Sequence, residues 1–316
     1  MTAPAATPDA ADLPAHGQPR LRSLLVPLDG SPLAEAALPA ARALAGALPA
    51  RVTLLHVMER GAPATVHGHE HLNDATRAEA YLADVARRFD GADGVTTHVH
   101  PNPEGDVAAS IAAHAAEFGA DLIVLCAHGE GNARGWMSGT IAQQVIRRAA
   151  PPVLLIRPEA GGRAVAFAPD GVLIALDGHE HGEAALAPAL ALARGLDLPV
   201  RLVMAVPTLG SLASREAPAA LFVPSATSAA LDIEEASAVS YLRNLCARLR
   251  ESGFAARGEV LRGDPAKVIA ATAARAPGGV FALATHGTAG FDAFWSESVG
   301  ARLIGKVTGP LLLVHP

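Results

Sequence analysis

The segment from Leu122 to Thr140 has the residue types and spacing that could bind an anion. Its apolar start, Leu122–Leu125, predicts a strand that is buried on both faces, and a corner of small residues, Cys126 to Gly129, follows it. Gly139-Thr140 then opens an amphipathic helix. A glycine-containing loop between a strand and a helix can present free backbone N–H groups and a positive helix terminus to a ligand. This arrangement suits a phosphate group.

An acidic residue, Asp29, ends the first apolar run of the chain, which begins at Leu24. In an open parallel sheet, ligands bind beyond the carboxyl ends of the strands, where the strand order reverses. Asp29 and the loop after Leu125 should both lie at that edge. The carboxylate could accept hydrogen bonds from a ribose or an adenine amino group, or it could cap the turn that follows it. These two roles stay open at this point.

Strands and helices alternate along the first half of the chain. Ser31 is a plausible N-cap with Pro32 at the first helical position, and Asp106 is placed to cap a later helix that ends near Gly119. Such alternation predicts a doubly wound parallel sheet of the α/β class. The five strands are expected at residues 24–29, 52–57, 95–99, 122–125 and 153–156.

The second half of the chain repeats the first. Leu28-Asp-Gly30 returns 148 residues later, whereas Gly105-Asp106 and His128-Gly129 each return 158 residues later, as Gly263-Asp264 and His286-Gly287. The increase of ten predicts an insertion in the second copy, within residues 207–228.

The repeat predicts two tandem, Rossmann-like domains of five parallel strands each. We expect a disordered tail over 1–20, a first domain over 21–158, a linker over 159–170 and a second domain over 171–316. The last strands of the two copies, Val153–Ile156 and Leu311–Val314, should be edge strands that meet antiparallel. The two domains would then form an internal pseudo-dimer.

The composition excludes several classes of protein. A net charge of −6 argues against a general nucleic-acid binder, which usually has a basic face. Two cysteines, Cys126 and Cys246, do not make a disulfide framework and favour a reducing compartment. Residues 1–20 lack the pattern of a signal peptide, and no apolar run approaches the roughly 20 residues of a membrane helix. We expect a cytoplasmic protein with no membrane partner.

Four motifs together resemble a universal stress protein domain. They are Val26-Pro-Leu-Asp-Gly-Ser31, Leu54-Leu-His-Val57, Gly105-Asp106, and His128-Gly129 followed after nine residues by Gly139-Thr140. The resemblance covers both copies. It implies a five-stranded parallel sheet between helices, and pairing of units through the last strand. Some members of that family bind ATP through Gly-x2-Gly-x9-Gly-(Ser/Thr), whereas others lack this pattern and bind no nucleotide.

Carried over residue by residue, the resemblance implies a nucleotide site in the first copy. Cys126 stands where the family has its first glycine, so a side chain adds bulk where backbone would approach the ligand. We expect it to weaken binding rather than abolish it, although a buried core thiol is the simpler role for this residue. The implied site has adenine and ribose near Pro27, Leu28, Asp29 and Val57, phosphates near Gly129, Gly139, Thr140 and Ile141, and Cys126 and His128 at the start of the loop.

The second copy departs further from the family pattern. Ala284 replaces the first glycine, and Glu297 stands at the third. A carboxylate at a phosphate position repels the ligand, at a cost of several kcal/mol for two charges about 4 Å apart at an effective dielectric near 20. We therefore expect a degenerate second site in which Asp177 is a structural remnant.

Two histidine clusters could also ligate a metal. His67-Gly-His-Glu-His71 is expected in a loop, and His179-Glu-His181 at the mouth of the second site. Neighbouring residues of a flexible loop seldom close a tetrahedral site without other ligands, so we interpret both as solvated and assign no metal ligands.

The sequence therefore predicts a stress-response protein whose first domain binds ATP or a related adenine nucleotide. Mg²⁺ is a candidate companion, because the only lysines, Lys267 and Lys306, both lie in the second copy. No catalytic residues stand out, so any ATP hydrolysis would be slow. The alternative is a nucleotide-free scaffold of the same fold that works through dimerisation or protein partners, and a homodimer is left open.

Overall fold

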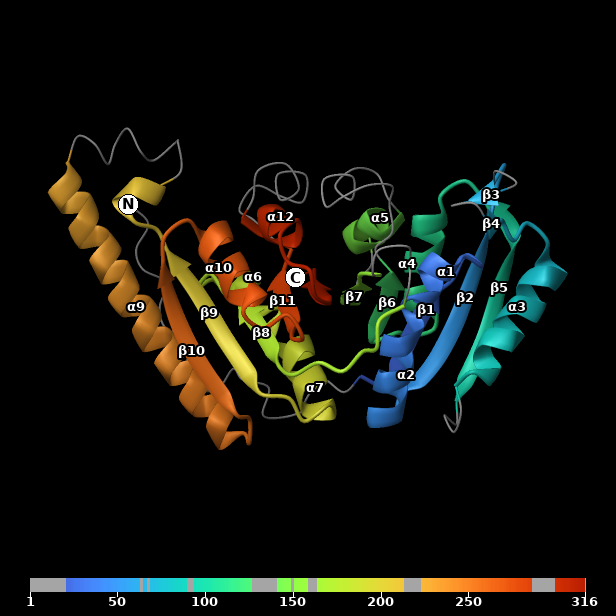
Figure 1. Ribbon diagram of the computed structural model, residues 1–316, viewed down its shortest axis with the longest axis horizontal. Coiled ribbons are helices and arrows are strands. Elements are labelled where there is room, and N and C mark those ends of the chain that lie inside the picture. Colours follow the sequence, from blue (N-terminus) through green and yellow to red (C-terminus); the bar gives the residue numbers. More distant parts are fainter. Residues whose placement is uncertain are drawn as a thin grey trace. The chain divides into compact units, whose positions relative to one another are not determined.

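A computed structural model shows the chain as two compact units (Figure 1). The first unit comprises Arg20–Ala168 together with Gly309–His315, and the second comprises Pro169–Thr308. The last strand of the second sequence repeat therefore belongs to the first unit. The structure describes residues 21–62, 65–66, 69–89, 94–126, 141–148, 151–158, 164–212, 223–285 and 299–315.

The sheet of the first unit has the order β12-β7-β6-β1-β2-β5. The chain builds β1, β2 and β5 outward on one side, then returns to the other side of β1 to build β6 and β7. These five strands are parallel, as the sequence predicts for a doubly wound fold. The strands are β1 (Ser23–Pro27), β2 (Arg51–Glu59), β5 (Val95–Glu104), β6 (Leu122–Cys126), β7 (Val153–Ile156) and β12 (Leu311–Val314).

The final strand of the chain pairs antiparallel with β7. Leu311 is opposite Leu155 and Leu313 is opposite Val153, and every residue of β7 and β12 is buried. This confirms the antiparallel pairing predicted for these two segments. The pairing satisfies the backbone edge that β7 would otherwise expose.

Local sequence explains where the helices of the first unit begin and end. The Ser31 hydroxyl accepts a hydrogen bond from Ala34 N, and Asp106 caps its helix in the same way through Ala109 N. Gly119 has a φ of +57° just after that helix, as its predicted C-terminal position requires. The helices are α1 (Pro32–Glu35), α2 (Leu38–Ala47), α3 (Ala75–Arg87), α4 (Val107–Glu117) and α5 (Ile141–Arg148), and a short antiparallel pair joins β3 (Thr65–Val66) to β4 (His69–Glu70).

The second unit repeats the parallel arrangement, with the order β10-β9-β8-β11. The strand order again reverses beside the first strand of the repeat, between β8 and β11. The strands are β8 (Val172–Ala175), β9 (Val200–Val206), β10 (Ala256–Arg262) and β11 (Val280–Ala284), and the helices are α6 (Glu180–Glu183), α7 (Leu186–Gly195), η2 (Leu209–Ser211), α9 (Pro224–Glu251), α10 (Pro265–Ala274) and α12 (Val299–Ile304).

The insertion predicted within 207–228 is only partly a connecting loop. The helix that follows it, α9, has 28 residues, whereas its counterpart α3 has 13. Part of the additional chain therefore extends this helix at its start. Residues 213–222 lie outside the described part of the chain.

The turn after β1 depends on a glycine. Gly30 has a φ of +87°, and a Cβ at this position would lie 2.6 Å from Leu72 Cδ1. We expect Gly30→Ala to lower the free energy of unfolding by more than about 1 kcal/mol, because both the backbone angle and the space disfavour a side chain. Urea unfolding followed by circular dichroism measures the change.

Gly46→Ala is the matched control for this substitution. Gly46 lies within α2, and nothing lies within 4 Å of an added Cβ. Helix propensity then favours alanine by about 0.5–1 kcal/mol. Equal effects of the two substitutions would contradict the account of the turn.

Candidate functional site

The carboxyl ends of β1 and β6 lie side by side where the strand order of the first unit reverses. Leu24 is opposite Leu122 and Leu25 is opposite Ile123, so both strands run toward the same edge and end there at Pro27 and Cys126. Doubly wound sheets form their ligand sites at this point. The connection from β6 to α5, with the predicted residues His128, Gly129, Gly139 and Thr140, lies outside the described residues.

Asp29 follows β1 at this edge and is partly buried. Its Oδ1 accepts a hydrogen bond from Ser31 N at 2.8 Å, so the capping role that the sequence left open is in place. A carboxylate offers two oxygens and about four acceptor positions, so capping the turn does not by itself exclude a further hydrogen bond. The capping and ligand-binding roles are compatible.

A buried histidine holds the backbone next to Asp29. His56, which is 1% exposed, places Nδ1 2.8 Å from Leu28 O and Nε2 3.1 Å from Leu72 O. Leu28 N also donates to Leu55 O. These contacts connect the end of β1 to β2 and to the segment before α3. The sequence motif that contains His56 does not reveal this role, because the partners of the side chain are backbone atoms.

Cys126 ends β6 as a buried, free thiol, in agreement with the simpler role considered for it. Burial first, and then the charge of Asp29, raise the pKa of the Cys126 thiol to about 12. The side chain is therefore neutral at physiological pH and adds no charge to the site.

The other described residues of the predicted site differ in burial and in their position relative to this edge. Pro27 and Leu28 are buried at the end of β1. Val57 lies on β2, two residues beyond Leu55, which is the register partner of Pro27, and is 7% exposed. Ile141 is the first residue of α5 and is 42% exposed, so it does not contribute to the core. The structure thus describes the strand-end wall of the predicted site and the helix start.

The corresponding acid of the second unit faces its own helix. Asp177 Oδ1 accepts a hydrogen bond from His179 N at 2.9 Å, and a Cβ added at Gly182 would collide with this oxygen. In the first copy, alanine, Ala34, occupies the position equivalent to Gly182. The Asp177 carboxylate therefore lies close against α6, in space that a methyl group would fill. Residues 286–298, which include Glu297, lie outside the described part of the chain.

The two predicted histidine clusters differ in structure. The expectation of a solvated loop is wrong for His71, which is 6% exposed and lies 4.0 Å from Glu59 through Nε2, because β3 and β4 fold this segment into a hairpin. His69 belongs to β4, and His67 lies outside the described residues. In the second unit, the exposed His179 precedes α6, which contains His181.

Comparison with known proteins decides the family. The profile of the universal stress protein family matches residues 20–157 and 170–315, which are the two sequence repeats. The chain belongs to the universal stress protein family. No curated protein matches it. In the described part of the chain, no helix is both long enough and apolar enough to cross a bilayer.

Two of the solved structures that resemble this chain share the fold over nearly its whole length. A universal stress protein from Archaeoglobus fulgidus DSM 4304 has a TM-score of 0.65 and 16% identity, over 94% of this chain and 97% of that one. A functionally unknown protein from Pseudomonas aeruginosa PAO1 has a TM-score of 0.65 and 17% identity, over 95% and 94%. A universal stress protein in complex with cAMP covers 44% of this chain and 98% of its own, at 21% identity and a TM-score of 0.34.

The raised pKa of Cys126 makes its thiol slow to react. In a Cys246→Ala background, we expect the folded protein to react with a disulfide reagent at pH 8 at least about 100-fold more slowly than the urea-unfolded protein, because thiolate is the reacting species. The rate should keep rising with pH beyond 9, since a thiol with a raised pKa deprotonates only at higher pH. A rate that levels off near pH 9 would contradict the buried environment of Cys126.

Proposed function

We propose that the first unit binds ATP or a related adenine nucleotide in a stress response, and that the second unit binds none. The observation that carries the proposal is the position of Asp29 beside the end of β6, at the reversal of strand order. The chain that leaves β6 contains Gly129, Gly139 and Thr140 at the spacing of the family's ATP-binding members. Asp29, which is proposed to contact ribose or adenine, and the loop sequence proposed to bind phosphate thus both follow strands that end at the same edge of the sheet.

Each part of the proposed site has a separate role. The Asp29 carboxylate accepts hydrogen bonds from the ribose or the adenine amino group, beside the apolar surface of Pro27, Leu28 and Val57. Backbone N–H groups of Gly129, Gly139 and Thr140, with Ile141 at the start of α5, bind the phosphates. His128 stands at the start of the phosphate-binding loop. Cys126 precedes it and places a side chain where the family's ATP-binding pattern has glycine.

The first site must neutralise phosphate charge without a lysine. Both lysines of the chain, Lys267 and Lys306, lie in the second repeat. Backbone dipoles and Mg²⁺ would supply the compensating charge. Since no general base is assigned, hydrolysis of the bound nucleotide would be slow, and the proposed role is binding rather than catalysis.

The second unit differs at the positions that matter for phosphate. Ala284 and Glu297 replace two glycines of the family pattern, and Glu297 would bring a negative charge to the phosphates. Asp177 is held against the start of α6. These differences support a degenerate site that retains the fold and has lost the ligand.

The second candidate function is a nucleotide-free scaffold that acts through dimerisation or protein partners. The observation in its favour is Cys126, a buried side chain where the family's ATP-binding pattern has glycine. A cytoplasmic location is part of either proposal, because both cysteines are free and buried. Domain boundaries at residues 20/21, 158/159 and 170/171 are likewise proposed.

Calorimetric titration of the untagged chain with Mg·ATP, after any bound nucleotide has been removed, separates the two functions. We expect one binding event, which Asp29→Ala weakens by at least about 10-fold because charge-assisted hydrogen bonds to the nucleotide are lost. Asp177→Ala is the matched control, since it removes the same type of turn-capping bond in the second unit. Gly139→Glu should abolish binding by placing a carboxylate at the phosphates.

Two results would contradict the proposed nucleotide site. One is the absence of a binding signal for the wild-type chain, which would favour the scaffold. The other is equal weakening by Asp29→Ala and Asp177→Ala, which would mean that binding depends on the acid of the second unit as much as on that of the first.

A further inference from the structure

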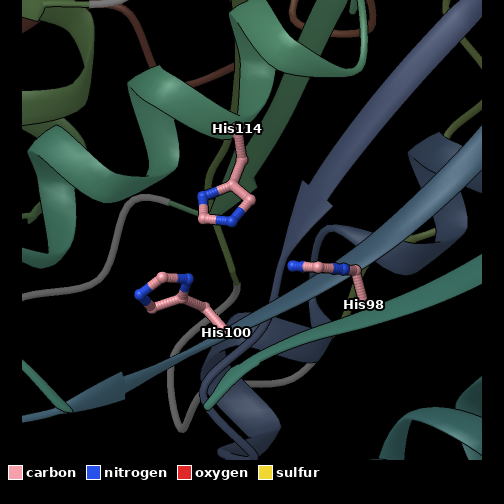
Figure 2. A group of neighbouring side chains, drawn as sticks. All are labelled: His98, His100 and His114. Carbon is pink, nitrogen blue, oxygen red and sulfur yellow. The ribbon is translucent and has the colours of Figure 1, made fainter. Parts of the chain in front are cut away.

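Three histidines converge in the first unit between β5, which pairs with β2, and α4. His98 and His100 lie two residues apart on β5 and therefore face the same side of the sheet. His114 comes from α4, and its ring centroid lies 5.0 Å from that of each of the other two. One nitrogen of each ring is within 4.8 Å of the others, and Figure 2 shows the three rings enclosing a common space.

The cluster is shielded on one side and accessible on the other. His114 is 6% exposed, whereas His98 and His100 are half-buried. The ring of Phe118 packs edge-on against His98, with centroids 5.1 Å apart. A ligand could reach the cluster from solvent and would then be partly enclosed by apolar surface.

Hydrogen bonds direct the lone pairs of two rings. His114 Nδ1 lies 2.7 Å from Ser110 O, and a carbonyl only accepts, so Nδ1 carries the hydrogen and Nε2 the lone pair. His100 Nε2 lies 3.1 Å from Glu104 Oε1, an arrangement in which Nε2 donates and Nδ1 is left with the lone pair. Metal-binding histidines usually donate their other N–H to a carbonyl or a carboxylate in this way.

We propose that His98, His100 and His114 bind a zinc ion, with water in the fourth position. Imidazole nitrogens are good ligands for Zn²⁺ at 2.0–2.1 Å, and a tetrahedral site needs them about 3.3 Å apart. The observed separations are within 4.8 Å, so small rotations of the side chains close the site. Glu104 orients His100, and the Ser110 carbonyl orients His114.

The charge balance agrees with a cation at this position. Imidazole binds a metal ion in its neutral form, so the three rings add no positive charge of their own. The carboxylates of Glu104 and Glu117 lie close to the cluster and attract positive charge. A divalent ion would accept the lone pairs of the three rings and would balance the negative charge of the nearby carboxylates.

Zinc titration of the full-length, untagged and chelator-treated chain tests the proposal. Competition with a chromophoric chelator should show one Zn²⁺ per chain, and His98→Gln/His100→Gln should weaken binding at least about 100-fold because two of three ligands are lost. Glu104→Gln should weaken it by about 10-fold, since it removes only an orienting bond. Circular dichroism spectra of each variant check that it is folded.

A matched control is available in the second unit. His179→Gln/His181→Gln alters a pair of equally spaced histidines outside the cluster and should leave zinc affinity unchanged. Three outcomes would overturn the proposal: no zinc binding by the wild-type chain, unchanged binding by the folded His98/His100 double variant, or loss of zinc only in the His179/His181 variant. Substitution by Co²⁺ should give the visible absorption of a four-coordinate site. The nucleotide proposal rests on other residues and stands or falls separately.

Discussion

The structure depends on the reversal of strand order beside β1. Because the chain places β2 on one side of β1 and β6 on the other, the connections that follow β1 and β6 diverge at the edge where doubly wound sheets bind their ligands. Asp29 and Cys126 meet there although they are 97 residues apart in the chain. His56 lies between the carbonyls of Leu28 and Leu72 and donates to one of them, so a buried polar side chain helps to fix the edge that any ligand would contact.

The two repeats share a turn after the first strand but differ in the residues around it. Both have an acid after the first strand, and in both its Oδ1 caps the next turn. In the first unit the field of that acid reaches the end of β6, whereas in the second the acid lies against Gly182. In the second unit, Tyr241 donates a hydrogen bond to Glu183 at 2.5 Å. In the first, the half-buried Tyr81 has its pKa raised by burial and then by the charge of Glu35, so a tyrosine lies near the equivalent glutamate. The fold is preserved while the residues that would contact phosphate have changed.

The sequence predicts most of the fold because the determining interactions are local or periodic. Ser31, Asp106 and Gly119 act within one helical turn of their own positions, and the apolar strands pair through backbone atoms. Prediction from the sequence fails where the structure depends on contacts between distant side chains or on the tolerance of an edge strand. β5 extends to Glu104 through Pro101 and Pro103, because an edge strand pairs on one side only and tolerates residues without an N–H. Likewise, the cluster of His98, His100 and His114 depends on how α4 lies over β5, which spacing along the chain does not reveal.

The most direct test of the central claim is the nucleotide content of the protein itself. Untagged chain, purified without added nucleotide and then denatured, would be analysed by mass spectrometry together with a Gly139→Glu variant prepared identically. The account predicts about one adenine nucleotide per wild-type chain and none from the variant. A wild-type chain that releases no nucleotide, or a variant that releases as much as the wild type, would contradict it.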